Sequence, residues 1–209
     1  MSMKECGDHK QKRQNRIRRL CACLLVFCFL VLLVFLITWA ILQPKKPSFV
    51  VRDATIYDFK VASSPDLFTS NFQITVSSRN PNDHIGIYYD KLDVYASYRG
   101  QQLTYYTVIP PTYQGHKSMN VWSPFISGTS VPIAPFIGEA LNLDQSNGGI
   151  QMMIKINGRV RWKVGAFVSG RYHLHVTCPV YIPYGSKNDN FDGETSIKVP
   201  LLASCAVSV

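Results

Sequence analysis

An Asp-His pair stands next to an Asn-Pro-Asn turn in the segment RNPNDHIGIYYD, residues 79–90. Asp83 and His84 could share a proton as general acid and base, or hold a metal ion between them. The preceding residues 80–82 are typical of a turn, because proline fixes φ and an Asn side chain bonds to nearby main chain. An alternation of apolar and other residues follows at once, over 85–90. The pattern therefore favours a turn that starts a strand over a reactive site.

A second pair of side chains that could bind metal lies in the segment YHLHV. His173 and His175 are two residues apart, so on a strand they share one face, a spacing that suits two zinc ligands. No Asp or Glu lies near the pair in the sequence, and His84 and His116 lie in distant loops. Two ligands are too few for a zinc site, so the pattern does not favour a metal centre.

Cationic and apolar side chains alternate in the segment RVRWKV: Arg159, Arg161 and Lys163 against Val160, Trp162 and Val164. Alternation on a strand places the two sets on opposite faces. One interpretation is a solvated outer face over a buried inner face. The other is an anion-binding row that meets cell-wall polyanions or lipid headgroups, because neighbouring positive charges raise the local potential. Both interpretations remain open, and both predict the same division into an inner and an outer face.

Sequence motifs of the common enzyme classes are missing from the chain. There is no Gly-x-Ser-x-Gly elbow, no phosphate-binding Gly-rich loop with a Lys, no His-Glu-x-x-His and no paired cysteines at zinc spacing. We therefore expect a protein without catalytic residues, metal or cofactor.

An uncharged apolar stretch of 23 residues runs from Leu20 to Leu42. About 20 apolar residues in a helix cross the hydrocarbon core of a bilayer, so the stretch predicts a transmembrane helix. The apolar core of a cleaved signal peptide is shorter, about 7–15 residues, and small residues follow it. The length and the Ile41-Leu42-Gln43-Pro44 ending favour an uncleaved signal-anchor.

The formal net charge of +9 divides unevenly along the chain. Residues 1–19 hold seven Lys and Arg against two acids, whereas residues 50–209 hold thirteen against eleven. The excess therefore belongs to the anchor, and the charge does not indicate nucleic-acid binding. The positive-inside rule predicts a cytosolic N-terminus facing anionic lipid and an exported C-terminal domain.

Only two of the six cysteines, Cys178 and Cys205, follow the predicted transmembrane helix and so lie in the part predicted to be exported. An oxidising compartment permits a bond between them, which we expect, although two small buried thiols are the alternative. Cys21 and Cys23 lie at the cytosolic end of the predicted helix, where palmitoylation or plain apolar packing would both fit.

From Phe49 onward the apolar pattern has a period of two, with Gly, Pro and Asn turns at short intervals. About seven or eight short strands of this kind predict a mainly β fold, an antiparallel β-sandwich. The Asn157-Gly158 pair between QMMIKI and RVRWKV predicts a type I′ hairpin turn. Residues 134–144 predict a short helix. The expected organisation is a tail at 1–19, a transmembrane helix at 20–42, a proline-rich linker at 43–48 and a sandwich at 49–209.

Five motifs in order resemble the plant NDR/HIN-like family: RNPNDHIGIYYDKLDVYASY, PPTYQGHK, WSPF, GRVRWKVG and YHLHVTCP. The family is named for non-race-specific disease resistance and harpin-induced genes. The resemblance implies a late embryogenesis abundant group-two domain with an immunoglobulin-like or fibronectin-like sandwich. It also implies a plant plasma membrane, in some members plasmodesmata, and a link to pathogen and stress responses. Two family signatures without an assigned reaction are carried by Asn80, Pro81 and Asn82, and by Tyr113, Gln114, Gly115, His116 and Lys117.

Two hypotheses of function follow. The first is a non-enzymatic single-pass membrane protein of plant defence and stress, whose exported sandwich contacts partner proteins or a cell-wall polyanion, with self-association left open. The second is a lipid-binding or hydrolytic domain that works at the membrane surface. A deep apolar pocket with convergent polar groups would favour the second hypothesis.

Overall fold

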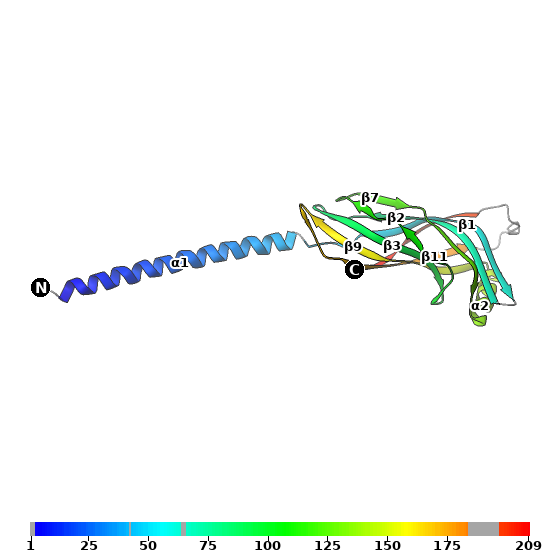
Figure 1. Cartoon of the computed structure of the whole chain (residues 1–209), viewed down its shortest axis with the longest axis horizontal. Coiled ribbons are helices and arrows are strands. Elements are labelled where there is room, and N and C mark those ends of the chain that lie inside the picture. Colours follow the sequence, from blue (N-terminus) through cyan, green and yellow to red (C-terminus); the bar gives the residue numbers. More distant parts are fainter. Residues whose placement is uncertain (1–2, 42, 64–65, 184–196) are drawn as a thin grey trace. The chain divides into compact units, whose positions relative to one another are not determined.

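A computed structural model describes residues 3–41, 43–63, 66–183 and 197–209, and the chain divides into two units, Met1–Gln43 and Pro44–Val209 (Figure 1). Residues 1–2 of the predicted tail and residue 42 of the predicted span lie outside the described residues, as do the side chains of residues 3–15 and 38–41.

The first unit is a single helix, α1 (Met3–Ile41). Within it, the 22-residue stretch Arg16–Ile37 has a mean hydropathy of 3.4, and none of its residues is buried. By length and composition this stretch could cross a membrane. The helix ends before Pro44, which lacks an N–H group and cannot continue it. The apolar helix that the sequence predicts is therefore present, and it extends back through most of the basic tail.

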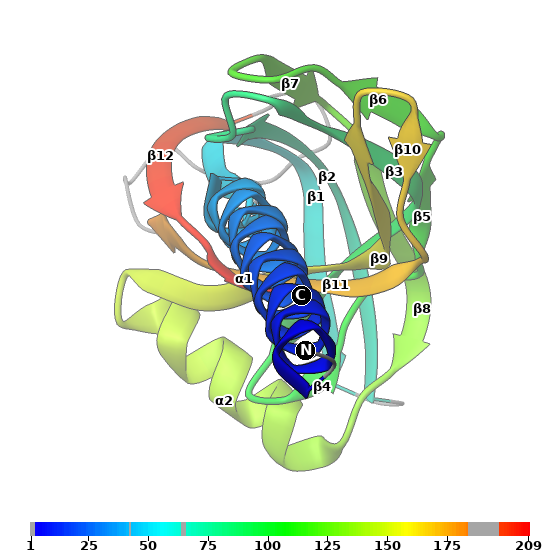
Figure 2. The same ribbon diagram turned by 90° about the vertical axis from the view of Figure 1, so that its left-hand side faces the viewer.

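The second unit consists of two antiparallel sheets (Figures 1 and 2). One sheet has the strand order β12 (Ile197–Ser204), β1 (Ser48–Ser63), β2 (Asp66–Arg79) and β7 (Met119–Trp122), and β8 (Phe125–Pro132) also pairs with β2. The other has the order β13 (Ala206–Ser208), β11 (Tyr172–Pro183), β9 (Gly149–Val164), β3 (Ile85–Tyr98) and β4 (Gln101–Gln102). In this second sheet β5 (Thr107–Ile109) and β6 (Thr112–Gln114) pair with β3, and β10 (Phe167–Val168) pairs with β9. The mainly β, antiparallel fold predicted from the sequence is confirmed.

The core lies between the sheets and collects every second side chain of the long strands. At one end, Phe49 of β1 and Trp122 of β7 pack around the ring of Tyr89 from the opposite sheet, with ring centroids 6.2 and 5.5 Å from it. At the other end lies helix α2 (Pro135–Ser146), which packs against β9 and against β1 and β2 (Figure 2). Its buried Ile137 and Leu141 are one turn apart, and a proline opens the helix, as is common at this position. The short helix expected at 134–144 is confirmed.

The predicted hairpin at Asn157-Gly158 is wrong, because both residues lie inside the single strand β9. Gly158 pairs with Leu92 of β3 on one side and with Leu174 of β11 on the other. A Cβ atom at this position would collide with the carbonyl oxygen of Lys91. The glycine therefore permits a close approach of two backbones, a second use of glycine in strands that local sequence does not distinguish from a turn.

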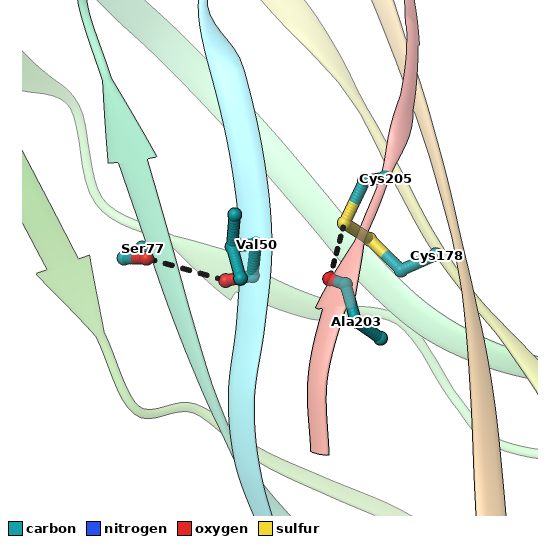
Figure 3. The surroundings of a disulfide bond; sticks show 5 residues. All are labelled: Val50, Ser77, Cys178, Ala203 and Cys205. Atoms are coloured by element: carbon teal, nitrogen blue, oxygen red, sulfur yellow. Dashed lines mark hydrogen bonds between the residues drawn. A yellow bond between two sulfur atoms is a disulfide. The ribbon is translucent and has the colours of Figure 1, made fainter.

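Cys178 and Cys205 form a disulfide, as the sequence predicts, with Cα atoms 4.2 Å apart (Figure 3). Cys178 belongs to β11, whereas Cys205 stands between β12 of one sheet and β13 of the other. The main-chain N–H of Cys205 also donates to the carbonyl of Phe49, at 3.0 Å. The bond therefore fixes the point at which the chain crosses between the sheets.

Candidate functional site

The Asn-Pro-Asn signature forms the crossing from β2 to β3, and hence from one sheet to the other. Asn80 is fully buried, and its Nδ2 donates to the carbonyls of Ile85, at 2.7 Å, and Gly115, at 2.9 Å. Its Oδ1 accepts from the main-chain N–H of Asn82, at 3.0 Å, and from the side-chain amide of Asn82, at 2.9 Å. All the hydrogen-bonding capacity of this amide is used inside the protein.

Asn82 joins the crossing to the segment that follows α1. Its Oδ1 accepts from the main-chain N–H of Lys45 at 2.7 Å, and its Nδ2 donates to the carbonyl of Lys45 at 2.8 Å. Pro47 is buried, and β1 begins at Ser48. The predicted linker at 43–48 is thus held on the sandwich from Lys45 onward. We name the Asn82–Lys45 contact the linker clamp.

The second family signature lies against the first. The main-chain N–H of Lys117 donates to the carbonyl of Asn82, and its ammonium group contacts the carbonyl of Pro81 and the carboxylate of Asp83, both at 3.0 Å. The hydrogen bond from Lys117 is the main cause that lowers the pKa of Asp83 below its usual range. The partner of Asp83 is therefore this lysine, whereas His84 and His116 are exposed to solvent. The two signatures form one structural unit.

Gln114 of the second signature is fully buried and connects the two sheets. Its Oε1 accepts from the hydroxyl of Tyr89 at 2.8 Å, and its Nε2 donates to the carbonyls of Ser78 and Ser118 at 2.8 and 3.0 Å. Ser78 Oγ lies 2.9 Å from the same tyrosine oxygen. Burial raises the pKa of Tyr89, so the hydroxyl remains protonated as a donor. Tyr89 lies within the first of the five family motifs and Ser78 directly before it, but nothing in the sequence indicates that their hydroxyl groups meet.

The remaining two residues of the second signature are Tyr113 and Gly115. The Tyr113 ring covers Gly86, where a Cβ would collide with it, and it packs on Tyr88 with centroids 4.6 Å apart. The carbonyl of Gly115 accepts from Asn80. Apart from the exposed His116, the residues of both signatures make contacts within the domain, and neither signature places an exposed acid, base and nucleophile together. Their arrangement supports a structural role.

The strand RVRWKV divides as the alternation predicts. Val160 and Trp162 are buried, whereas Arg159 is exposed and Arg161 and Lys163 are half-buried on the outer face. The three cations differ from one another. Arg161 makes a bidentate contact with Asp90, donating from Nη2 to Oδ1 at 2.6 Å and from Nε to Oδ2 at 3.0 Å. The Lys163 ammonium lies 5.8 and 5.4 Å from the ring centroids of Tyr88 and Tyr113. In the described part of the chain, Arg159 alone of the three has no such contact.

His173 and His175 lie side by side on the outer face of β11, with parallel rings 6.4 Å apart. His175 Nδ1 is 3.0 Å from Asn157 Oδ1. No group of three or more His, Cys, Asp or Glu side chains suited to a metal ion occurs among the described residues. The two histidines instead line a polar hollow of about 430 Å³ with residues of β3 and β9.

Fold and site together define a β-sandwich domain that follows an apolar N-terminal helix. A family model described as "Late embryogenesis abundant protein" matches residues 75–178. NDR1/HIN1-like protein 1 of Arabidopsis thaliana is 55% identical over 209 residues, which are 99% of this chain and 100% of the relative. NDR1/HIN1-like protein 12 of the same plant is 50% identical over the whole of both chains, and NDR1/HIN1-like protein 26 is 42% identical over 76% of this chain and 75% of its own.

The chain belongs to the NDR1/HIN1-like family, with a late embryogenesis abundant domain, as its motifs predict. A crystal structure of a protein from Archaeoglobus fulgidus aligns with 69% of this chain at a TM-score of 0.31 and 11% identity, too low to bear on function.

Proposed function

We propose that this protein is a non-enzymatic, single-pass plasma-membrane protein of plant defence and stress response that presents its sandwich outside the cell to partner proteins or to a cell-wall polyanion. Membership in the NDR1/HIN1-like family supports the link to plant stress and defence. The observation that carries the membrane placement is the apolar stretch Arg16–Ile37, none of which is buried within the described part of the chain. Water would penalise such a surface, whereas lipid would not.

The orientation follows from charge. The basic excess lies before the apolar stretch, so the N-terminal segment stays in the cytosol, next to anionic lipid. The sandwich is then exported, where the disulfide is stable. The linker clamp supports a role in presentation, because it fixes the chain from Lys45 onward against the domain.

The alternative, a lipid-binding or hydrolytic domain, has less support. Lipid handling needs a deep apolar cavity, whereas the hollow beside the histidines is lined by charged and amide side chains. Hydrolysis needs a nucleophile or an activated water, and the polar groups at the two family signatures are bonded to one another. Binding to partner proteins or to a cell-wall polyanion is therefore the better supported function.

A protease-protection experiment tests the orientation. The full chain, tagged at each end, is expressed in plant protoplasts, and protease is added to intact cells. We expect loss of the C-terminal tag and survival of the N-terminal tag. The reverse pattern would contradict both the topology and the export of the sandwich, and release of a shortened, soluble product would indicate a cleaved signal instead.

A further inference from the structure

A β-bulge in β3 determines which acid meets which base on the outer face of its sheet. Tyr89 pairs with Val160 and Lys91 pairs with Arg159, so the residue between them, Asp90, is the extra one. Without the bulge, Asp90 would stand opposite Arg159. Bulges of this kind re-aim side chains and are frequent next to functional sites.

Because of the bulge, Asp90 forms ion pairs with two other arginines. Asp90 receives Arg161 at 2.6 Å and Arg171 at 3.2 Å, so two guanidinium groups share one carboxylate. Arg159 is left between Lys91 on β3 and His173 on β11, its direct cross-strand neighbours. Like charges directly opposite each other destabilise a sheet. Lys91 is partly compensated by Asp93, and an anion bound over this row would further reduce its repulsion with Arg159.

The next cross-strand row supplies hydrogen-bonding groups. It consists of Asp93, Asn157 and His175. Asp93 Oδ2 is 3.0 Å from the Lys91 ammonium, but Asp93 Oδ1 is buried without a hydrogen-bond partner. Such a group is uncommon in folded proteins, because an unmade hydrogen bond is costly. The accessible oxygen of Asp93 in the hollow is therefore Oδ2, which has lone pairs left to accept from a further donor.

Both rows line the same hollow of about 430 Å³. We propose that this hollow binds a carboxylate-bearing saccharide, with the uronate carboxylate on Arg159 and sugar hydroxyls on Asp93 and Asn157. A sugar acid matches the two rows because it carries an anion and several hydroxyl donors within one small, polar molecule. A guanidinium group pairs with a carboxylate through two parallel hydrogen bonds, which gives this contact both energy and orientation.

This site would be the place where the cell-wall polyanion proposed above binds. It rests on that proposed function, because the sandwich meets such a saccharide only if it is exported. Its binding test is independent of that placement. The full chain is purified and reconstituted in discs of phosphatidylcholine, which carries no net charge. Short oligomers of galacturonic acid are titrated by calorimetry, beside their fully methyl-esterified form and beside polyaspartate, which has carboxylates but no hydroxyls. We expect binding of the free acid, no binding of the ester and weaker binding of polyaspartate.

Two pairs of variants separate a built site from a positive surface. Arg159→Gln should weaken binding by about tenfold or more, since a charge-assisted hydrogen bond is lost. Lys155→Gln removes the same charge from the same face of β9, outside the hollow, and should change binding by less than about twofold. Asp93→Asn should also weaken binding, although it makes the surface more positive. Asp58→Asn, on the other sheet, is its matched control and should have no effect.

Three outcomes would overturn the proposal, because each indicates attraction by charge alone. The first is an equal loss of saccharide affinity in Arg159→Gln and Lys155→Gln, and the second is tighter binding in Asp93→Asn. The third is equal binding of polyaspartate and galacturonate oligomers. Binding of phosphatidylserine vesicles in place of the saccharide would also overturn it and assign the surface to lipid. Circular dichroism and thermal unfolding of each variant show that a loss of binding is not a loss of folding. If the protease experiment shows that the sandwich is not exported but the saccharide still binds, the binding site is supported and its extracellular location is contradicted.

Discussion

Asn82 and Lys45, 37 residues apart in the sequence, pair through two hydrogen bonds of 2.7 and 2.8 Å. The side-chain amide of Asn82 bonds to the main chain of Lys45 as a neighbouring strand would. Asn80 in turn holds the amide of Asn82 in place. The family signature therefore acts at the point where the chain passes from the helix into the sandwich.

Replacing Asn82 by Ala should lower the free energy of unfolding by about 1–3 kcal/mol, because the polar groups of Lys45 and Asn80 lose their partner. Hydrogen exchange at the Lys45 amide should become much faster, while exchange in the centre of β1 changes less. His84→Ala, an exposed neighbour, is the control and should shift stability by less than about 0.5 kcal/mol. Unchanged protection of Lys45 in Asn82→Ala would show that the clamp is absent in solution.

The disulfide should contribute about 3–4 kcal/mol in the chain-entropy model, since it closes a loop between residues 27 apart. The double variant Cys178→Ala/Cys205→Ala should lose this amount in chemical denaturation. Thiol labelling of the denatured, unreduced protein should spare both positions. Full labelling there would contradict the bond, and Cys21→Ser, in the helix, should leave denaturation of the sandwich unchanged.

The outer and inner faces of β9 should respond differently to substitution. Trp162→Ala should cost about 3–5 kcal/mol through the cavity that it leaves. Arg159→Gln should cost less than about 0.5 kcal/mol, because the side chain is exposed. Arg161→Gln should fall between them, at about 1–2 kcal/mol, because it releases Asp90 from a bidentate, half-buried contact. Equal effects of the two arginine variants in thermal unfolding would show that this contact contributes nothing.

Tyr98 should make stability depend on pH in the alkaline range. Burial first, and then the carboxylate of Asp144 that accepts from its hydroxyl at 2.5 Å, raise the pKa of Tyr98 from 10.0 to about 12. The unfolded chain thus releases the proton at lower pH than the folded one. The contribution of Tyr98 is complete below about pH 10 and is lost as the pH rises to about 12. Tyr98→Phe should flatten the decline in unfolding free energy over that window, and an unchanged slope would contradict the assignment.

Much of the sandwich could be predicted from the sequence because inward and outward positions alternate, and alternation is a local property. It places Val160 and Trp162 correctly inside. The same local signal fails at Asn157-Gly158, where the turn-like pair lies in the middle of a sheet. What decides there is the backbone of Lys91, more than sixty residues away, and no property of the pair itself reveals it.

The candidate sites show the same limit. The two signatures could be recognised as motifs, yet their mutual contacts depend on a crossing between sheets that spacing alone does not define. The hollow beside Arg159 could not be predicted, because it requires the register of three strands and a bulge at Asp90. In the sequence the three cations of this strand look equivalent. In the fold, Arg161 pairs with Asp90 and Lys163 lies over two tyrosine rings, whereas Arg159 has neither kind of contact.

The linker clamp affects how the domain responds to a pulling force. A pull along the chain from the helix reaches Lys45 before it reaches β1, so the amide of Asn82 takes the first load. Beyond it, β1 is paired on both sides, with β2 and β12, and a force along a strand must shear many such bonds together. β12 is in turn fastened to the opposite sheet at Cys205. A domain built in this way can stay folded under a pull that enters through the helix.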